Sequence, residues 1–175
     1  MRKLYIPILV LLVAALVPAD ADAARRHVRA QLKSFDEVPS LSTAGHGLFR
    51  GTLSNDGEEL AFILSYDDLE GEVLQAHLHL GQTGVNGGIS IFLCSNLGNG
   101  PAGTQECPPP PATVSGTVSA EDVIGPNGQG IAPEEWEEVK RAIAAGVVYA
   151  NVHSDLFPGG EIRGQLRVDQ RRDRP

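Results

Sequence analysis

The sequence predicts an all-β fold, an antiparallel sandwich or barrel of about eight strands with one helix. Two observations lead to this prediction. Short apolar runs rich in β-branched residues recur along the chain, and turn signals such as Asn55-Asp56-Gly57 separate them. Only one segment carries a helical pattern instead. Residues 24–168 are long enough for one domain with a single core.

The expected strands follow one another between turns. The first, within HVRAQLKS, places Val28, Ala30 and Leu32 on one face. The segment HGLFRGTLSNDGEELAFILSY holds the next two, joined at Asn55-Asp56-Gly57, a sequence suited to the positive φ angles of a tight hairpin. The remaining strands are expected in GEVLQAHLHL, ISIFLC, TVSGTVS, GVVYANVH and GEIRGQLRV.

The expected helix covers residues 133–145 and precedes the last two strands. Pro133 suits its first turn, acidic residues crowd its start and basic residues follow, as the helix dipole favours. Trp136, Val139 and Ile143 fall on one stripe. We therefore expect this helix to pack against one side or end of the sandwich.

Residues 1–23 are typical of a secretory signal peptide. Arg2 and Lys3 precede the apolar run from Ile6 to Val17, and small residues follow at cleavage spacing. The run is too short for a membrane span, which takes roughly 20 apolar residues. We expect a secreted or periplasmic protein with no membrane span after cleavage, and a polar tail at residues 169–175.

The two cysteines, Cys94 and Cys107, agree with that location. A pair this close in an exported chain predicts a disulfide that ties the Gly- and Asn-rich segment between them. Their spacing is not CxxC, so a catalytic or metal-binding dithiol is disfavoured.

The charge of the chain argues against a nucleic-acid partner. Its formal net charge is −8 at pH 7. The basic clusters lie at the ends of the mature chain, and no basic stripe is visible in the sequence that could displace counterions from phosphates. The expected partner is instead an unknown extracellular or periplasmic protein or surface.

Three histidines form the strongest candidate site. In GEVLQAHLHL, the strand period places His77 and His79 on the face opposite the core, two residues apart. In GVVYANVHSD, His153 falls on the corresponding polar face. If the two strands are neighbours, three imidazoles can converge on one ion, a set that suits copper or zinc.

Other polar residues are expected around these ligands, each with an alternative role. Tyr149 and Asn151 share the polar face with His153. Glu161 and Arg163 could orient His153 or steer an anion, but a cross-strand ion pair is favoured. Glu37 could accept a histidine N–H, although bonds to local backbone N–H groups are favoured.

The familiar catalytic motifs are absent from the sequence. GQTGVNGG lacks the lysine and following helix of a phosphate loop, and no serine or cysteine lies in a nucleophile elbow. The paired carboxylates Asp67-Asp68 and Glu134-Glu135 fit a turn and a helix start. No catalytic residue is predicted, and an enzyme is not the expected class.

Three separated blocks resemble the CHRD domain, the module named after chordin and found in exported bacterial proteins. They are AQLKSFDEVPSLSTAGHG, AHLHLGQTGVNGGISIFL and AGVVYANVHSDLFPGGEIRGQL, and the likeness extends from Val28 to Val168. The chain departs from the family pattern at Ser40, where a second proline is usual, and at His46, where a small or hydroxyl residue is usual. The resemblance implies a β-rich extracytoplasmic domain of undefined biochemical role.

A fainter similarity connects the chain with copper-zinc superoxide dismutase. That enzyme is a β-sandwich whose strand-borne His-x-His supplies copper ligands outside the barrel core, so His77 and His79 would correspond to the pair. The bridging histidine, the zinc-ligand cluster and the Gly-rich motifs of the dismutase have no counterpart here. The similarity therefore implies at most a mononuclear site, with copper as the candidate cofactor and zinc less suited.

Three hypotheses follow for the function. The leading one is a non-enzymatic binding module that holds a metal ion or a partner on its polar strand face. The second is a mononuclear copper redox protein with superoxide dismutase-like activity. The third is a structural domain whose histidines bond loops such as SDLFPGGE against the sheet.

Overall fold

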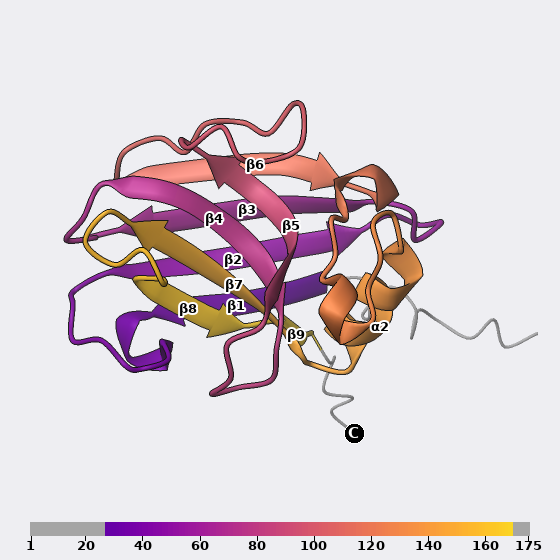
Figure 1. Ribbon diagram of the computed structural model, residues 1–175, viewed down its shortest axis with the longest axis horizontal. Helices are drawn as coiled ribbons and strands as arrows, with labels where there is room; N and C mark the ends of the chain where they lie inside the picture. Colours follow the sequence, from indigo (N-terminus) through magenta and orange to yellow (C-terminus); the bar gives the residue numbers. More distant parts are fainter. Residues whose placement is uncertain (1–26, 170–175) are drawn as a thin grey trace, which may run out of the picture.

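The computed structural model describes residues 27–169, which form one antiparallel sheet and a short helix (Figure 1). The sheet has nine strands in the order β5-β4-β7-β8-β1-β2-β3-β6, and β9 pairs with β1. The strands are β1 (His27–Lys33), β2 (His46–Leu53), β3 (Leu60–Asp67), β4 (Val73–Leu80), β5 (Gly88–Ser95), β6 (Ala112–Val118), β7 (Val148–Ser154), β8 (Ile162–Gln165) and β9 (Arg167–Val168). The predicted all-β class is confirmed; the count rises because the last expected strand divides into β8 and β9.

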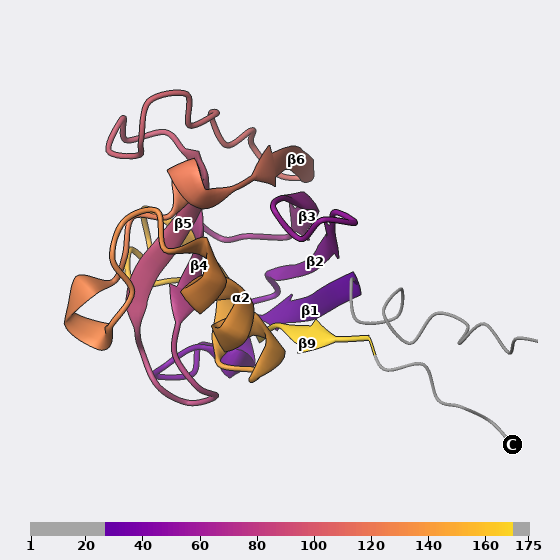
Figure 2. The ribbon, with the colours of Figure 1, turned by 90° about the vertical axis from the view of Figure 1, so that its right-hand side faces the viewer.

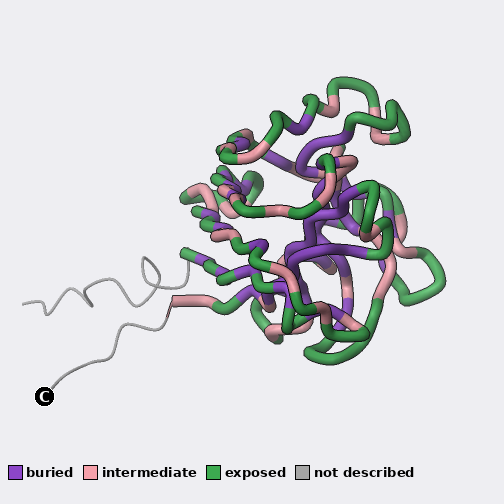
Figure 3. Tube along the Cα trace, turned by 90° about the vertical axis from the view of Figure 1, so that its left-hand side faces the viewer, coloured by how far each residue is buried: buried purple, intermediate pink, exposed green. Residues whose placement is uncertain are grey.

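The sheet curls into a nearly closed barrel. In the end view of Figure 2, β4 and β5 face β1, β2 and β3 across the interior, and β6 lies above β3, with which it pairs. A single bridge between Ile91 and Val123 adds a link from β5 to the segment after β6. The buried residues concentrate in the interior and the exposed ones on the rim and loops (Figure 3).

Alternation along each strand fills this interior. On β1, Val28, Ala30 and Leu32 point into the core, as their spacing predicts. The hairpin between β2 and β3 is also where the sequence predicts it, with Leu53 opposite Leu60 and Gly57 at a φ of 80°. The turn signals in the sequence therefore identify this connection correctly.

The helix α2 (Trp136–Ala144) is shorter than the predicted 133–145. Its start is delayed because Glu134 adopts a positive φ of 67°, so the residues from Pro133 on form a turn. The predicted stripe of Trp136, Val139 and Ile143 is buried against the core. The Trp136 Nε1–H also donates to the carbonyl of Gly57 at 2.8 Å, which fixes the helix against the β2–β3 hairpin. Three strands, rather than two, follow α2.

Three short 3-10 turns complete the described secondary structure. They are η1 (Ser34–Asp36), η2 (Ala120–Asp122) and η3 (Asn127–Gln129). The first of them directly follows β1 and carries the chain across the outside of the sheet toward Glu37.

The predicted disulfide is present. Cys94 at the end of β5 bonds Cys107, with a sulfur–sulfur distance of 2.01 Å. Both cysteines are buried, and the Asn96 side chain bonds the backbone of Cys107 in both directions. Within residues 27–169 no helix has the length and apolarity needed to cross a membrane. The predicted signal peptide and most of the predicted tail lie outside the described residues.

Candidate metal centre

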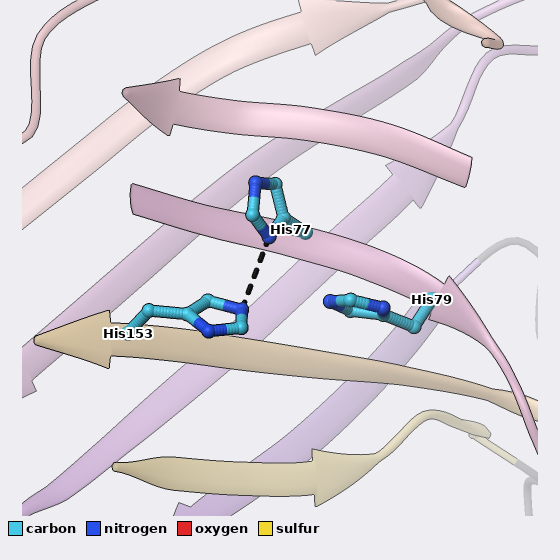
Figure 4. Close-up of side chains that lie close together, drawn as sticks. All are labelled: His77, His79 and His153. Carbon is cyan, nitrogen blue, oxygen red and sulfur yellow. Dashed lines mark hydrogen bonds between the residues drawn. The ribbon is translucent and has the colours of Figure 1, made fainter. Parts of the chain in front are cut away.

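Strands β4 and β7 are direct neighbours, which meets the condition that the sequence alone left open. Their antiparallel register places His153 opposite Gln75, and His77 opposite Asn151. His79 lies two residues further along β4, so its ring approaches the same point from the other side. Figure 4 shows the three rings turned toward one another. Their ligand atoms all lie within 4.8 Å of one another.

These histidines are on the outer face of the sheet, as predicted, yet they are buried. His77 is 0% exposed, and His79 and His153 are each 6% exposed. The segments that follow β4 and β7 supply the cover: His79 Nδ1 bonds the carbonyl of Gly87 at 3.0 Å, and His153 Nδ1 bonds that of Pro158 at 3.0 Å. Loops therefore cover the part of this face that carries the three histidines.

The two carbonyl contacts fix the tautomers of two rings. A carbonyl oxygen only accepts hydrogen bonds, so Nδ1 of His79 and of His153 carries the proton. Each Nε2 then presents a lone pair. His153 Nε2 lies 3.1 Å from His77 Nδ1, so in the metal-free protein His77 Nδ1–H donates to it.

This arrangement leaves two nitrogen atoms without partners. The Nε2 atoms of His77 and His79 are buried and make no hydrogen bond with any described residue. Buried polar atoms are hydrogen-bonded in the large majority of cases, because an unmet group carries its desolvation cost. An incomplete polar cluster of this kind is typical of a site that binds a ligand.

The spacing of the rings suits a metal ion. Two nitrogens bound to one ion at about 2.0 Å each lie roughly 3.3 Å apart when the bond angle is tetrahedral. The distance between His77 Nδ1 and His153 Nε2 is 3.1 Å. An ion bound there would displace the proton from His77 Nδ1 to His77 Nε2, and His79 would supply the third ligand.

The protonation state of the cluster also favours metal binding. Burial lowers the pKa of His77 to about 2, helped by the nearby His153 and His79 rings. Burial lowers the pKa of His79 to about 4 and also lowers that of His153. All three imidazoles are therefore neutral at neutral pH, and neutral imidazole is the form that binds metals.

The comparisons with known proteins identify the family. The family model for the CHRD domain matches residues 28–166. The chain belongs to the CHRD family. No curated protein and no solved structure matches it. CHRD domains are extracellular binding modules, and the Cys94–Cys107 disulfide agrees with that setting.

Aromatic rings pack against the histidine cluster of this CHRD domain. The Phe92 ring on β5 meets His77 edge-on, with the ring centres 4.4 Å apart. Tyr149 stacks on His79 at 4.8 Å with the planes 4° apart, and the guanidinium of Arg163 lies 3.4 Å from the centre of the same tyrosine ring. The His79 ring therefore has little freedom to turn away from the cluster.

Arg163 holds the loop that covers His79. It is 2% exposed and donates to the carbonyls of Val85 at 2.6 Å and Gln82 at 3.3 Å, and to the Asn86 side chain at 3.1 Å. Within the described residues neither Arg163 nor Glu161 forms an ion pair, although a cross-strand ion pair was the alternative that the sequence favoured. The role of Arg163 in the structure is to fix the loop at residues 81–87.

Glu161 lies apart from the histidines. Its carboxylate accepts hydrogen bonds from the backbone N–H groups of Glu70 at 2.6 Å and Gly71 at 3.4 Å. It orients the segment before β4 rather than His153. The alternation of residues along a strand predicts only the face on which Glu161 lies. It cannot predict these partners, which are backbone groups about 90 residues away in the sequence.

Glu37 was expected to accept a hydrogen bond either from a histidine or from local backbone N–H groups, and its main side-chain partner is instead Asn151. Its Oε1 accepts a hydrogen bond from the Asn151 side chain at 2.5 Å, and Asn151 lies opposite His77. Burial raises the pKa of Glu37 to about 7, while Arg163 and the bonds from Asn151 and the Val38 backbone oppose the rise. Glu37 thus supports the strand that carries His153 without touching a histidine.

Sequence reasoning missed the groups that complete the cluster. Phe92 was assigned only to a strand, and the Gly87 carbonyl lies in a segment considered only as a phosphate loop. The Pro158 carbonyl belongs to SDLFPGGE, the loop expected to bond histidines in the structural hypothesis, and that contact is present. Phe92 could have been found from its parity on β5, but the carbonyls require the fold.

Proposed function

We propose that this CHRD domain is an exported binding module that holds one copper ion on His77, His79 and His153. The observation that carries the proposal is the buried, unpartnered Nε2 atom of His79 in a cluster of three histidines whose ligand atoms all lie within 4.8 Å of one another. Histidines with only a structural role would be expected to satisfy both ring nitrogens.

The ligand set supports copper rather than zinc. Closed zinc sites almost always have four ligands, and the cluster offers three. The two buried carboxylates of residues 27–169 have other partners, because Glu161 is bonded to backbone N–H groups and Glu37 to Asn151. Copper accepts a trigonal set that includes imidazoles.

The charge around the site favours the monovalent state of copper. All three ligands are neutral, and the positive charge of Arg163 lowers the pKa of His79. Burying a charge without a counterion is costly, and the cost grows steeply with the charge of the ion. A singly charged ion therefore costs less here than a doubly charged one.

Burial argues against dismutase-like catalysis. A catalytic metal site keeps an open coordination position for water or substrate, whereas the ligand atoms here lie beneath the segments that carry Gly87 and Pro158. The large groove on the outer face of β1 and β2 is lined by other residues, not by the histidines. The proposed role is therefore to hold the ion rather than to cycle it with a substrate.

The test is metal uptake by the oxidised, folded protein. Titration with copper(I) under anaerobic conditions, followed by desalting and metal analysis, is expected to give one copper per chain. His79→Ala should reduce uptake to background, whereas His46→Ala, which removes an exposed histidine outside the cluster, should retain it. Full uptake by His79→Ala, or none by the unaltered protein, would overturn the proposal.

A further inference from the structure

A groove of about 780 Å³ runs over the outer face of β8, β1 and β2. None of the three clustered histidines lines this groove. Glu37 and Arg163 do line it, and both also support the segments around the histidines. In a chain of net charge −8, this groove is basic, because five cationic residues and only two acidic ones line it. The cations are Arg29, Lys33, Arg50, Arg163 and Arg167, and the acids are Asp36 and Glu37.

Three of these arginines form a row across three adjacent strands, with Arg29 in the middle. Arg29 lies directly opposite Arg50 on β2 and directly opposite Arg167 on β9. All three are exposed. Like charges at directly opposed positions destabilise a sheet, so the free protein maintains an unfavourable arrangement here. Such local conflicts are expected where a surface serves a function.

The chain itself relieves little of this repulsion. Arg29 pairs with Asp169 at 2.8 Å. Within residues 27–169, neither Arg50 nor Arg167 forms an ion pair. Their guanidinium groups remain available for an external anion, and guanidinium binds carboxylate and sulfate groups in a two-pronged manner.

The spread of the cations calls for an extended ligand. Lys33 and Arg29 are on the same face of β1, and four residues of strand span about 13 Å. Arg50, Arg29 and Arg167 lie on three adjacent strands, a span of about 10 Å. One small anion cannot reach all of these groups, whereas a chain with repeated negative charges can.

We propose that the groove binds a linear acidic polysaccharide that carries sulfate or carboxylate groups. A peptide is less suitable because β1 and β2 are both paired along their two sides, so neither offers a free edge for a peptide strand. The groove also lacks a deep apolar pocket for peptide anchors. Its largest apolar residues are Leu48, on the strand floor, and Phe35, which is 66% exposed and gives a sugar ring a flat surface to pack on.

The test measures binding of the oxidised protein to polymers immobilised on a sensor surface. The acidic glycans are dextran sulfate and polygalacturonate; neutral dextran and poly-L-glutamate serve as comparisons. We expect both acidic glycans to bind with salt-dependent affinity and neutral dextran not to bind. The Arg50→Gln/Arg167→Gln variant should bind the acidic glycans at least about tenfold more weakly.

A matched control separates the groove from general charge attraction. Lys140→Gln/Arg141→Gln removes the same charge from α2, which does not line the groove, and should leave glycan affinity unchanged. Melting temperatures check folding, and Arg50→Gln/Arg167→Gln should melt no lower than the unaltered protein because it relieves repulsion. No glycan binding, equal weakening in the two variants, or poly-L-glutamate binding as tight as glycan binding would each overturn the proposal.

Discussion

Strands β7 and β1 carry similar alternating sequences, but their outer faces have opposite surroundings. On β7 the outward residues Tyr149, Asn151 and His153 are 3%, 2% and 6% exposed. On β1 the outward residues, such as Arg29 and Lys33, are all exposed. Loops close over the first face and leave the second open. Alternation therefore decides which way a side chain points, whereas the connections decide whether it meets water.

This difference determines what each region can do. The closed half around β4 and β7 removes water from three neutral imidazoles and leaves two of their nitrogens unpartnered. The open half around β1 and β2 presents arginines in a groove. The proposed ion therefore belongs to the closed half and the proposed polymeric ligand to the open half.

Replacing one arginine in each half gives the largest contrast. Arg163→Ala should lower the free energy of unfolding by about 4 kcal/mol, because it removes a large buried side chain together with its hydrogen bonds to the Gln82 and Val85 carbonyls. Arg50→Ala, on the open half, should change it by no more than about 0.5 kcal/mol. Urea unfolding of the metal-free protein measures both. Similar losses in the two variants would break the comparison.

Acid should destabilise the closed half when no metal is bound. The pKa of His79 falls from 6.5 in the unfolded chain to about 4 in the fold. A lowered pKa contributes stability that is present above pH 6.5 and is lost as the pH falls toward 4. At about 1.4 kcal/mol per pKa unit, His79 alone accounts for roughly 3 kcal/mol by pH 4.

Glu37 should partly offset this loss. Its pKa is raised from 4.5 to about 7, so its contribution is fully present below pH 4.5 and is lost as the pH rises through 7. The Glu37→Gln variant lacks the gain on acidification, and its unfolding free energy should fall more steeply between pH 7 and 5 than that of the unaltered protein. Parallel pH profiles would show that Glu37 does not titrate in this range.

A glycine pair provides the smallest contrast. Gly160 has a φ of 128°, and an added Cβ would lie 2.5 Å from Asn151 Nδ2 and 2.7 Å from Glu37 Oε1. Gly160→Ala should therefore cost about 2 kcal/mol. At the neighbouring Gly159 an added Cβ meets nothing within 4 Å, so Gly159→Ala should cost less than about 0.5 kcal/mol. Thermal melts of the two variants decide whether the Glu37–Asn151 contact supports the closed half.

The sequence predicts much of the fold because its signals are local. The β2–β3 hairpin, the helix stripe and the disulfide all follow from residues close together in the chain. The predicted start of α2 was wrong because Glu134 adopts a left-handed backbone conformation, which the spacing of apolar and charged residues does not reveal. The division between β8 and β9 depends on pairing with β1, which only the assembled sheet determines.

The candidate site was predictable in part. The parity of His77, His79 and His153 places them on the outer face, and the pairing of β4 with β7 brings them together. Their burial was not predictable, since it comes from loop carbonyls at Gly87 and Pro158. The arginine groove was also invisible, because Arg29, Arg50 and Arg167 become neighbours only through the sheet register.

X-ray absorption of the copper-loaded protein tests the central claim most directly. The fine structure should show about three nitrogen ligands near 2.0 Å with the outer-shell scattering of imidazole, and the edge should be that of monovalent copper. His79→Ala should lose one imidazole or all bound copper. A spectrum dominated by sulfur or carboxylate ligands, or one that His79→Ala leaves unchanged, would contradict the proposal that these three histidines form the metal site.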